Sequence, residues 1–173
     1  MNKVDLINRL LAKTTGNNYL EIGVEYGVSF LRVKAKNKLA VDPHFRLLGL
    51  IKLISRLTKG SSRFFEYTSD EFFAKKSDYL KKNPIDVVLI DGLHAFGQSL
   101  KDVENCLKYL SADGFVVMHD ANPKSKSSAF VFGSHNEARQ KSWWKKLVPR
   151  FFVPWCGDVW KTKLYPPSRN TMG

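Results

Sequence analysis

The sequence contains few cysteines and no long apolar run, and both features narrow the kind of protein it can be. Only Cys106 and Cys156 occur in 173 residues, and no metal-type C-x-x-C spacing is present. This usage is typical of a reduced intracellular protein with buried thiols. No window approaches the roughly 18 uninterrupted apolar residues of a membrane span, and the N-terminus lacks the apolar core of a signal peptide. We therefore expect a soluble, cytoplasmic protein.

The charge of the chain is strongly positive and unevenly distributed. The formal net charge is +12, with +7 in residues 1–60, −3 in residues 61–122 and +8 in residues 123–173. A basic excess can attract nucleic acid, an anionic membrane surface or phosphorylated substrates, and the sequence does not rank the three. The remaining composition, 43% hydrophobic and 25% charged, is ordinary for a globular protein. We expect one domain spanning residues 1–173.

Strand and helix patterns alternate along the first two thirds of the chain. Short apolar runs predict strands at residues 18–22, 38–42, 63–67, 85–90 and 115–118. Helical patterns occupy residues 3–13, 28–34, 45–59, 71–80 and 98–110. This alternation is typical of an α/β fold, with a doubly wound, mostly parallel sheet and helices on both faces.

Residues 45–59, FRLLGLIKLISRLTK, have apolar side chains around most of the circumference of a helix. Lys52, Arg56 and Lys59 share one side of that helix by their spacing. A helix packed against the sheet accounts for this pattern, and so does a basic amphipathic helix lying on a membrane surface. Peripheral membrane contact through the basic segments therefore stays an expectation.

Residues 121–156 lose regular periodicity. They are rich in Ser, Lys and Asn at first, and then become aromatic and basic, with Trp143, Trp144 and Trp155. A long irregular segment in a compact domain is usually either functional or disordered. We interpret this segment as a lid or insertion.

The segment Tyr19 to Ser29, YLEIGVEYGVS, predicts a buried strand, a tight glycine turn and a helix start. Glycines such as Gly23 can adopt positive φ and let the backbone approach a ligand. Asp42 stands at the tip of the next strand, about 20 residues on, where a carboxylate can bind the two hydroxyls of a ribose. The turn opens with Glu21 and lacks the G-x-G-x-x-G spacing of dinucleotide-binding domains. The pattern therefore indicates a nucleoside cofactor without the dinucleotide fingerprint.

Polar or ionisable residues stand at the end of every predicted strand. Because open α/β sheets bind ligands at the carboxyl ends of their strands, we expect these residues to share one site. In strand order they are Glu21 and Gly23; Asp42 and His44; Thr68, Ser69 and Asp70; Asp91 and His94; and His119 and Asp120.

Several of these residues have a second interpretation. Asp42 either binds a ribose or caps the chain, and Asp70 either lies near an adenine or N-caps the following helix. His94 is either a base or a surface residue of a turn. Asp91 and Asp120 would repel each other in a dry site unless a cation such as Mg²⁺ lay between them. The alternative is that Asp91 contacts the cofactor alone while Asp120 caps the next turn.

The strand-end motifs resemble those of a bacterial group of class I S-adenosylmethionine (SAM) dependent methyltransferases. That group has a strand ending in I-D-G-x-H, as at residues 90–94, and a later strand ending in H-D, as at residues 119–120. The first glycine turn and the G-D-V-W-K run at residues 157–161 are also similar, so the resemblance covers residues 17–161. It implies a Rossmann-like sheet with strand order 3-2-1-4-5, and methyl transfer from SAM to a hydroxyl of a small molecule or glycan.

The resemblance also implies roles for single residues. Glu21, Gly23 and Gly27 would line the methionine end of SAM, Asp42 the ribose, and Ser69 with Asp70 the adenine. Asp91 would serve both the cofactor and the catalytic step, and His94 would be the base. By likeness to related sugar O-methyltransferases, Asp91 and Asp120 would hold magnesium, with His119 as a further ligand.

The chain departs from the family pattern near its C-terminal end. Methyltransferases of this class add a sixth strand and an antiparallel seventh after strand five, and residues 162–173 are too short and too Pro-rich for both. We expect these strands to be short or missing, which would expose a sheet edge and favour a homodimer. Two other functions stay open: a nucleic-acid methyltransferase or RNA-binding module, and a non-catalytic, truncated methyltransferase-like protein.

Overall fold

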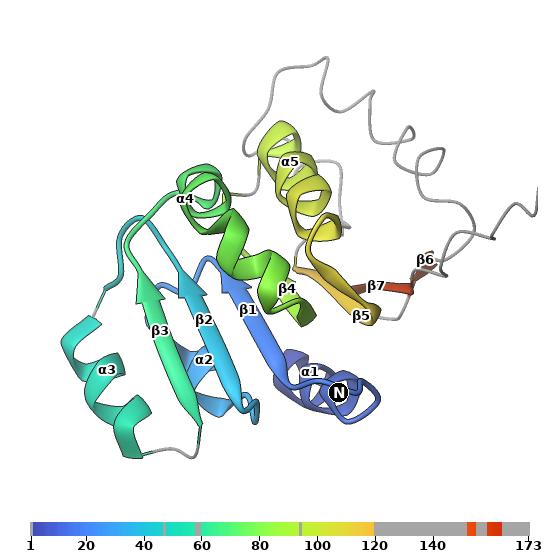
Figure 1. Cartoon of the computed structure of the whole chain (residues 1–173). Coiled ribbons are helices and arrows are strands. Elements are labelled where there is room, and N and C mark those ends of the chain that lie inside the picture. Colours follow the sequence, from blue (N-terminus) through green and yellow to red (C-terminus); the bar gives the residue numbers. More distant parts are fainter. Residues whose placement is uncertain are drawn as a thin grey trace, which may run out of the picture.

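The computed structural model describes residues 2–46, 48–57, 60–93, 95–119, 152–154 and 159–163. Strands and helices alternate along the chain, as predicted (Figure 1). The helices are α1 (Lys3–Leu11), α2 (Val28–Arg32), α3 (Leu48–Leu57), α4 (Ser69–Lys82) and α5 (Phe96–Leu107). The strands are β1 (Asn18–Ile22), β2 (Asn37–Val41), β3 (Ser61–Phe65), β4 (Ile85–Ile90), β5 (Leu110–His119), β6 (Phe152–Pro154) and β7 (Val159–Lys163). The ranges predicted for β1 and β4 are confirmed.

The strands of the described residues form one sheet in the order β3-β2-β1-β4-β5-β7-β6. β1 to β5 pair in parallel, which confirms the predicted order 3-2-1-4-5 and the Rossmann-like fold. β7 runs antiparallel to both β5 and β6. These last two strands are short, as predicted, but β6 falls inside the segment predicted to be irregular. Because β7 pairs with β5, the β5 edge is not the open edge that suggested a homodimer.

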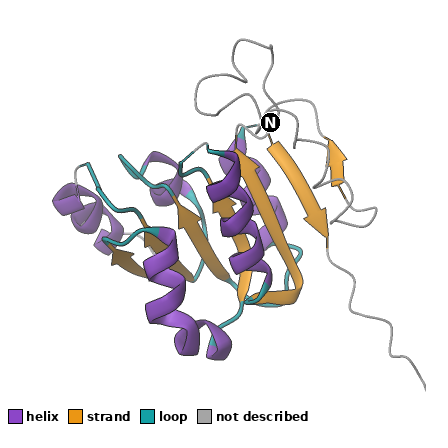
Figure 2. Cartoon of the chain, turned by 90° about the horizontal axis from the view of Figure 1, so that it is seen from above, coloured by secondary structure: helices purple, strands orange, loops and turns teal. Residues whose placement is uncertain are grey.

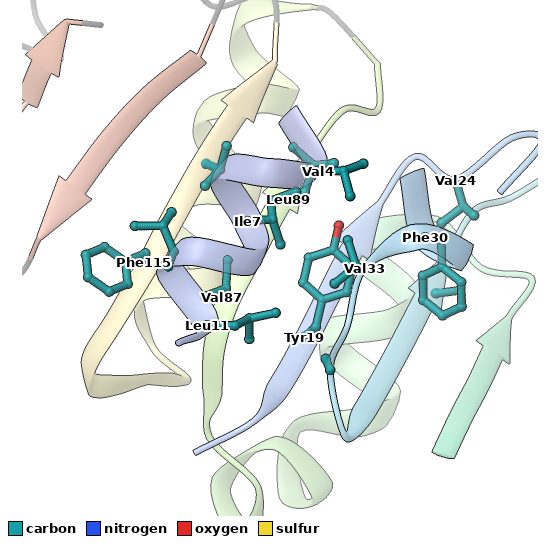
Figure 3. Close-up of a cluster of buried hydrophobic side chains, with 14 of the residues drawn as sticks. Val4, Ile7, Leu11, Tyr19, Val24, Phe30, Val33, Val87, Leu89 and Phe115 are labelled. Carbon is teal, nitrogen blue, oxygen red and sulfur yellow. The ribbon is translucent and has the colours of Figure 1, made fainter. Parts of the chain in front are cut away.

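Helices cover both faces of the sheet (Figures 1 and 2). α1, α2 and α3 contribute Ile7, Phe30 and Ile51 to one buried cluster. Figure 3 shows the apolar side chains of α1 lying against the sheet in this cluster. α4 and α5 contribute Phe72 and Cys106 to a second cluster on the opposite face. The burial of Cys106 agrees with the predicted buried thiols, whereas Cys156 lies outside the described residues.

Two local features differ from the sequence-based expectations. Thr68, and not Asp70, is the N-cap of α4: its hydroxyl accepts the N–H of Glu71 at 3.2 Å, and the Glu71 carboxylate accepts the N–H of Thr68 at 3.1 Å. β5 begins at Leu110, five residues before the strand predicted at 115–118, and its pairing with β4 shifts register between Leu110 and Phe115. Gly114 permits this irregularity, because a Cβ there would lie 2.6 Å from the Cγ of Leu110.

α3 covers less of the sheet than its apolar sequence suggests. Ile51 is 1% exposed and Ser55 is 6% exposed, so one side of α3 packs inward. The outer side consists of Leu50, Leu53, Ile54 and Leu57, which are 50%, 56%, 36% and 82% exposed. Packing on the sheet therefore accounts for only part of the apolar pattern. No helix within the described ranges combines the length and the apolar character needed to cross a membrane.

Candidate functional site

The glycine turn after β1 is shaped by the close approach of the neighbouring chain. Gly23 has a φ of +83°, and a Cβ there would clash with the backbone carbonyl of Asp91. Gly27 has a φ of +72° and is the N-cap residue of α2. Glu25, between the two glycines, also has a positive φ, of 48°. These three conformations fold residues 23–27 into a tight turn at the carboxyl end of β1.

Asp42, just after β2, fastens this turn. Its Oδ2 accepts hydrogen bonds from the backbone N–H groups of Val24 and Glu25, both at 2.8 Å. Its Oδ1 accepts the N–H of His44, also at 2.8 Å. A carboxylate offers about four lone-pair positions, so these three bonds leave it further acceptor capacity. Asp42 therefore caps the local backbone and can still accept a hydrogen bond from a ligand.

A cleft of about 740 Å³ lies at the carboxyl ends of the central strands. Its volume is in the range typical of small-molecule and cofactor sites. Seven of the predicted site residues line it: Glu21, Gly23, Asp42, Thr68, Ser69, Asp70 and Asp91. Gly27 shapes the turn but does not line the cleft. His94 and Asp120 lie outside the described residues.

Glu21 is buried at the inner wall of the cleft. It is 2% exposed, and its Oε2 accepts a hydrogen bond from the Tyr19 hydroxyl at 2.6 Å. Burial raises the pKa of Glu21 to about 8, against the lowering effects of the Tyr19 hydrogen bond and of the Lys3 charge. The carboxyl is therefore mostly protonated at neutral pH. Burial, together with Glu21, also raises the pKa of Tyr19 well above its usual value.

Asp91, just after β4, has both carboxylate oxygens engaged. Its Oδ2 lies 2.7 Å from the Nζ of Lys3 in α1, and its Oδ1 lies 3.0 Å from the Nδ1 of His119 in β5. Burial acts to raise the pKa of Asp91, but the hydrogen bonds from His119 and Lys3 outweigh it and hold the pKa below its usual value. Asp91 is therefore an ionised carboxylate that links α1, β4 and β5 at the cleft.

The opposite end of the cleft is built by α4 and α5. The Nε2 of Gln98 lies 3.1 Å from the Ser69 hydroxyl and 2.9 Å from the Oδ1 of Asp102. Asp102 is 1% exposed, and burial raises its pKa. The Oδ2 of Asp70 accepts a hydrogen bond from the Nζ of Lys101 at 2.6 Å. Its Oδ1 is buried and has no hydrogen-bond partner within the part of the chain that the structure describes.

Sequence reasoning missed several residues that line or support the cleft. Lys3 reaches Asp91 although the two are 88 positions apart, and the amphipathic pattern of α1 gave no signal of that contact. Tyr19 could have been found, because residues two apart in a strand share a face. Gln98 and Asp102 stand four apart in α5, as side-chain partners on a helix do, but nothing in the sequence directs them toward the cleft.

The described residues do not offer magnesium a site. No group of three or more His, Cys, Asp or Glu side chains that could hold a metal ion occurs among them. Asp91 is one of the two predicted ligands, and its oxygens are already bonded to Lys3 and His119. The Lys3 ammonium thus supplies positive charge beside Asp91, as a metal would. Since Asp120 lies outside the described residues, the paired metal site stays a prediction.

A family model described as a methyltransferase domain matches residues 20–121 of the chain. The matched range contains β2 to β5, most of β1, and nearly all the residues that line the cleft. A comparison with curated proteins by sequence finds no match.

Solved structures with a similar fold include several methyltransferases. CalS11, described as a TDP-rhamnose 3'-O-methyltransferase of calicheamicin biosynthesis, has a TM-score of 0.67 at 13% identity, over 92% of this chain and 76% of its own. MycE of the mycinamycin pathway, in complex with Mg, SAH and mycinamycin VI, has a TM-score of 0.66 at 16% identity, over 98% of this chain and 51% of its own. The N-methyltransferase NodS from Bradyrhizobium japonicum WM9 has a TM-score of 0.57 at 14% identity, over 95% of both chains. At these identities the likeness shows a shared fold.

Proposed function

Since this chain belongs to the family of methyltransferase domains that its residues 20–121 match, we propose that it transfers the methyl group of SAM to a hydroxyl oxygen of a sugar or another small molecule. One observation carries the proposal: seven predicted site residues, from four separate stretches of the chain, line one cleft of about 740 Å³ at the carboxyl ends of the strands. This is where open α/β sheets bind their ligands.

The polar atoms of the cleft complement the parts of SAM. Asp42 has acceptor capacity left for the ribose hydroxyls after its three backbone bonds. Asp70 Oδ1, which lacks a hydrogen-bond partner among the described residues, suits the amino group of the adenine. Lys3 is the one Lys or Arg among the described residues that line the cleft, and an ammonium suits the carboxylate of SAM. Gly23 keeps the turn beneath the methionine end compact.

When bound, SAM supplies a methyl group on a sulfonium that is already a good leaving group, so the main task of the protein is to align the acceptor oxygen. The acceptor hydroxyl must also lose its proton. His94 is the proposed base, by likeness to the family. His119 is a second candidate, because Asp91 holds its Nδ1 at 3.0 Å and thereby directs Nε2 as the nitrogen that takes a proton.

The acceptor proposal follows from the structural neighbours. CalS11 is described as acting on TDP-rhamnose, and MycE is described as bound to mycinamycin VI. NodS, an N-methyltransferase, shares the fold, so an amine acceptor is the alternative to a hydroxyl. An acceptor screen with nucleotide sugars and amino sugars separates the two, since the product retains either an O-methyl or an N-methyl group.

Metal dependence has its own test. MycE is described as binding Mg, whereas in this chain Lys3 already neutralises Asp91. The Lys3–Asp91 pair favours methyl transfer without a divalent ion, so chelation with EDTA should leave the rate unchanged. A loss of activity that Mg²⁺ restores would assign Asp91 and Asp120 to a metal instead.

Isothermal titration of the protein with SAM tests the first step of the proposal, with S-adenosylhomocysteine as competitor. No heat and no competition in a folded sample would leave the non-catalytic alternative. His94→Ala and His119→Ala then identify the base: loss of the true base should lower turnover by about 10²- to 10⁴-fold while SAM affinity stays nearly unchanged. RNA binding that falls steeply with salt, without small-molecule turnover, would support the nucleic-acid alternative.

A further inference from the structure

The outer side of α3 is an apolar stripe that none of the described residues covers. Leu50, Leu53, Ile54 and Leu57 follow one another at the i, i+3, i+4 and i+7 spacing of a single helix face, and each is at least 36% exposed. We call these four residues the α3 face. Single exposed leucines are ordinary, but a contiguous apolar patch on a soluble domain usually marks a binding surface.

The surroundings of the α3 face are strongly basic. Residues 26–65, which form α2, β2, α3 and β3, contain nine Lys or Arg and a single acid, Asp42. Of the nine, Lys38 is buried and Arg46 pairs with Glu25. Residues 66–107, which form α4, β4 and α5, contain five Lys or Arg against eight acids. α3 itself carries Lys52, which is exposed, and Arg56, and it has no acidic residue. The apolar stripe and the positive charge therefore occur in the same half of the molecule.

The inward side of α3 packs beside the glycine turn that borders the cleft. α3 packs inward through Ile51 beside Gly27, since a Cβ on Gly27 would lie 3.0 Å from the Ile51 side chain. Tyr26 and Val28 flank Gly27, line the cleft, and are 47% and 64% exposed. Exposed apolar surface thus runs on both sides of the contact between the turn and α3.

We propose that the α3 face docks on an anionic lipid bilayer, with the leucines entering the interface and the surrounding lysines and arginines meeting the lipid headgroups. This combination of an aliphatic face and basic flanks is the one that interfacial helices use. A second copy of the chain fits less well, because it would bring two basic surfaces together. Nucleic acid also fits less well, because the exposed side chains are aliphatic and do not stack on bases.

Co-sedimentation of the full chain with lipid vesicles tests the docking, and it requires neither SAM nor turnover. The protein should pellet with vesicles of phosphatidylcholine and phosphatidylglycerol, and much less with phosphatidylcholine alone. The double variant L53S/L57S should bind about tenfold more weakly or worse, because two leucine side chains no longer enter the interface. K52E should weaken binding about fivefold or more, since each basic residue near the surface contributes to the attraction.

K81E is the matched control, because it makes the same charge change on exposed α4 and should bind vesicles as the wild type does. Circular dichroism and SAM titration of each variant establish that it is folded, so a loss of vesicle binding is distinguishable from a failure of the proposed enzymatic function. Three results would overturn the docking: wild-type protein that stays in the supernatant with anionic vesicles, equal weakening by K52E and K81E, or a wild-type dimer that L53S/L57S dissociates without any effect on vesicle binding.

Discussion

α1 and α3 each carry a contiguous apolar face, and the surroundings of these two faces are opposite. Four of the five apolar residues of α1, Val4, Ile7, Leu10 and Leu11, are at most 7% exposed, and the fifth, Leu6, is partly buried. Those of the α3 face are at least 36% exposed. Both helices belong to the layer on the same side of the sheet, so their difference cannot come from the choice of face.

The difference follows from where each helix lies along the sheet. α1 packs on β4, a central strand, and its side chains meet neighbours from several strands (Figure 3). α3 lies beside β3, the edge strand of the sheet, and packs on α2 (Figure 1). Periodicity thus tells which residues share a helix face, and the topology decides whether anything covers that face.

The largest expected effect on the free energy of unfolding comes from a substitution in α1. Ile7 is fully buried, so Ile7→Ala should lower the free energy of unfolding by about 2–5 kcal/mol through lost burial and a residual cavity. Urea unfolding followed by circular dichroism measures the change. A cost below about 0.5 kcal/mol would mean that α1 does not pack on the sheet as described.

The next effect on stability concerns the buried Glu21. Its folded pKa of about 8 lies above the unfolded value, so the stabilisation it gives is complete below the unfolded pKa and is lost as the pH rises through about 8. Between pH 5.5 and 8 the wild type should therefore lose roughly 2–3 kcal/mol relative to Glu21→Gln. Thermal unfolding of both proteins across this range checks the sign, and parallel curves would contradict the raised pKa.

A smaller effect is expected at the N-terminal end of α1. The Lys3–Asp91 pair is partly exposed, so Lys3→Met should cost only about 1 kcal/mol at pH 7. Because the pKa of Asp91 is lowered, the stability it contributes is present above its unfolded pKa and is lost as the pH falls through the folded pKa. The difference between wild type and Lys3→Met should therefore shrink as the pH falls below the ordinary pKa range of an aspartate, as measured by urea midpoints. A constant difference would assign the effect of Lys3 to packing of its aliphatic stem.

The smallest effect is expected on the α3 face. Leu57 is 82% exposed, so Leu57→Ala should change the free energy of unfolding by no more than about 0.5 kcal/mol. The same urea experiment that measures Ile7→Ala serves here, and the two substitutions remove comparable aliphatic groups. A cost for Leu57→Ala close to that of Ile7→Ala would contradict the exposure of the α3 face, because it would mean that Leu57 is buried as Ile7 is.

The sequence predicts the scaffold of this protein better than its site. The apolar runs at β1 and β4 predict these strands correctly, because a central parallel strand is buried on both faces and is therefore apolar along nearly its whole length. The strand tips Asp42, Asp70 and Asp91 also come together at the cleft, since parallel strands end at one edge. The contact between Lys3 and Asp91 could not be predicted, because it depends on how α1 lies across the sheet. The exposure of α3 is likewise a result of its position beside the edge strand and not of its own pattern.

The most direct test of the account is a titration of SAM into three proteins: the wild type, Asp70→Asn and Leu57→Ala. The wild type should bind SAM in competition with S-adenosylhomocysteine, and Leu57→Ala should bind it equally well. Asp70→Asn should bind about tenfold more weakly, because it replaces a carboxylate whose Oδ1 is proposed to accept the adenine amino group. Folded wild-type protein that gives no heat with SAM, or an Asp70→Asn variant that binds SAM as tightly as the wild type, would contradict the assignment of this cleft.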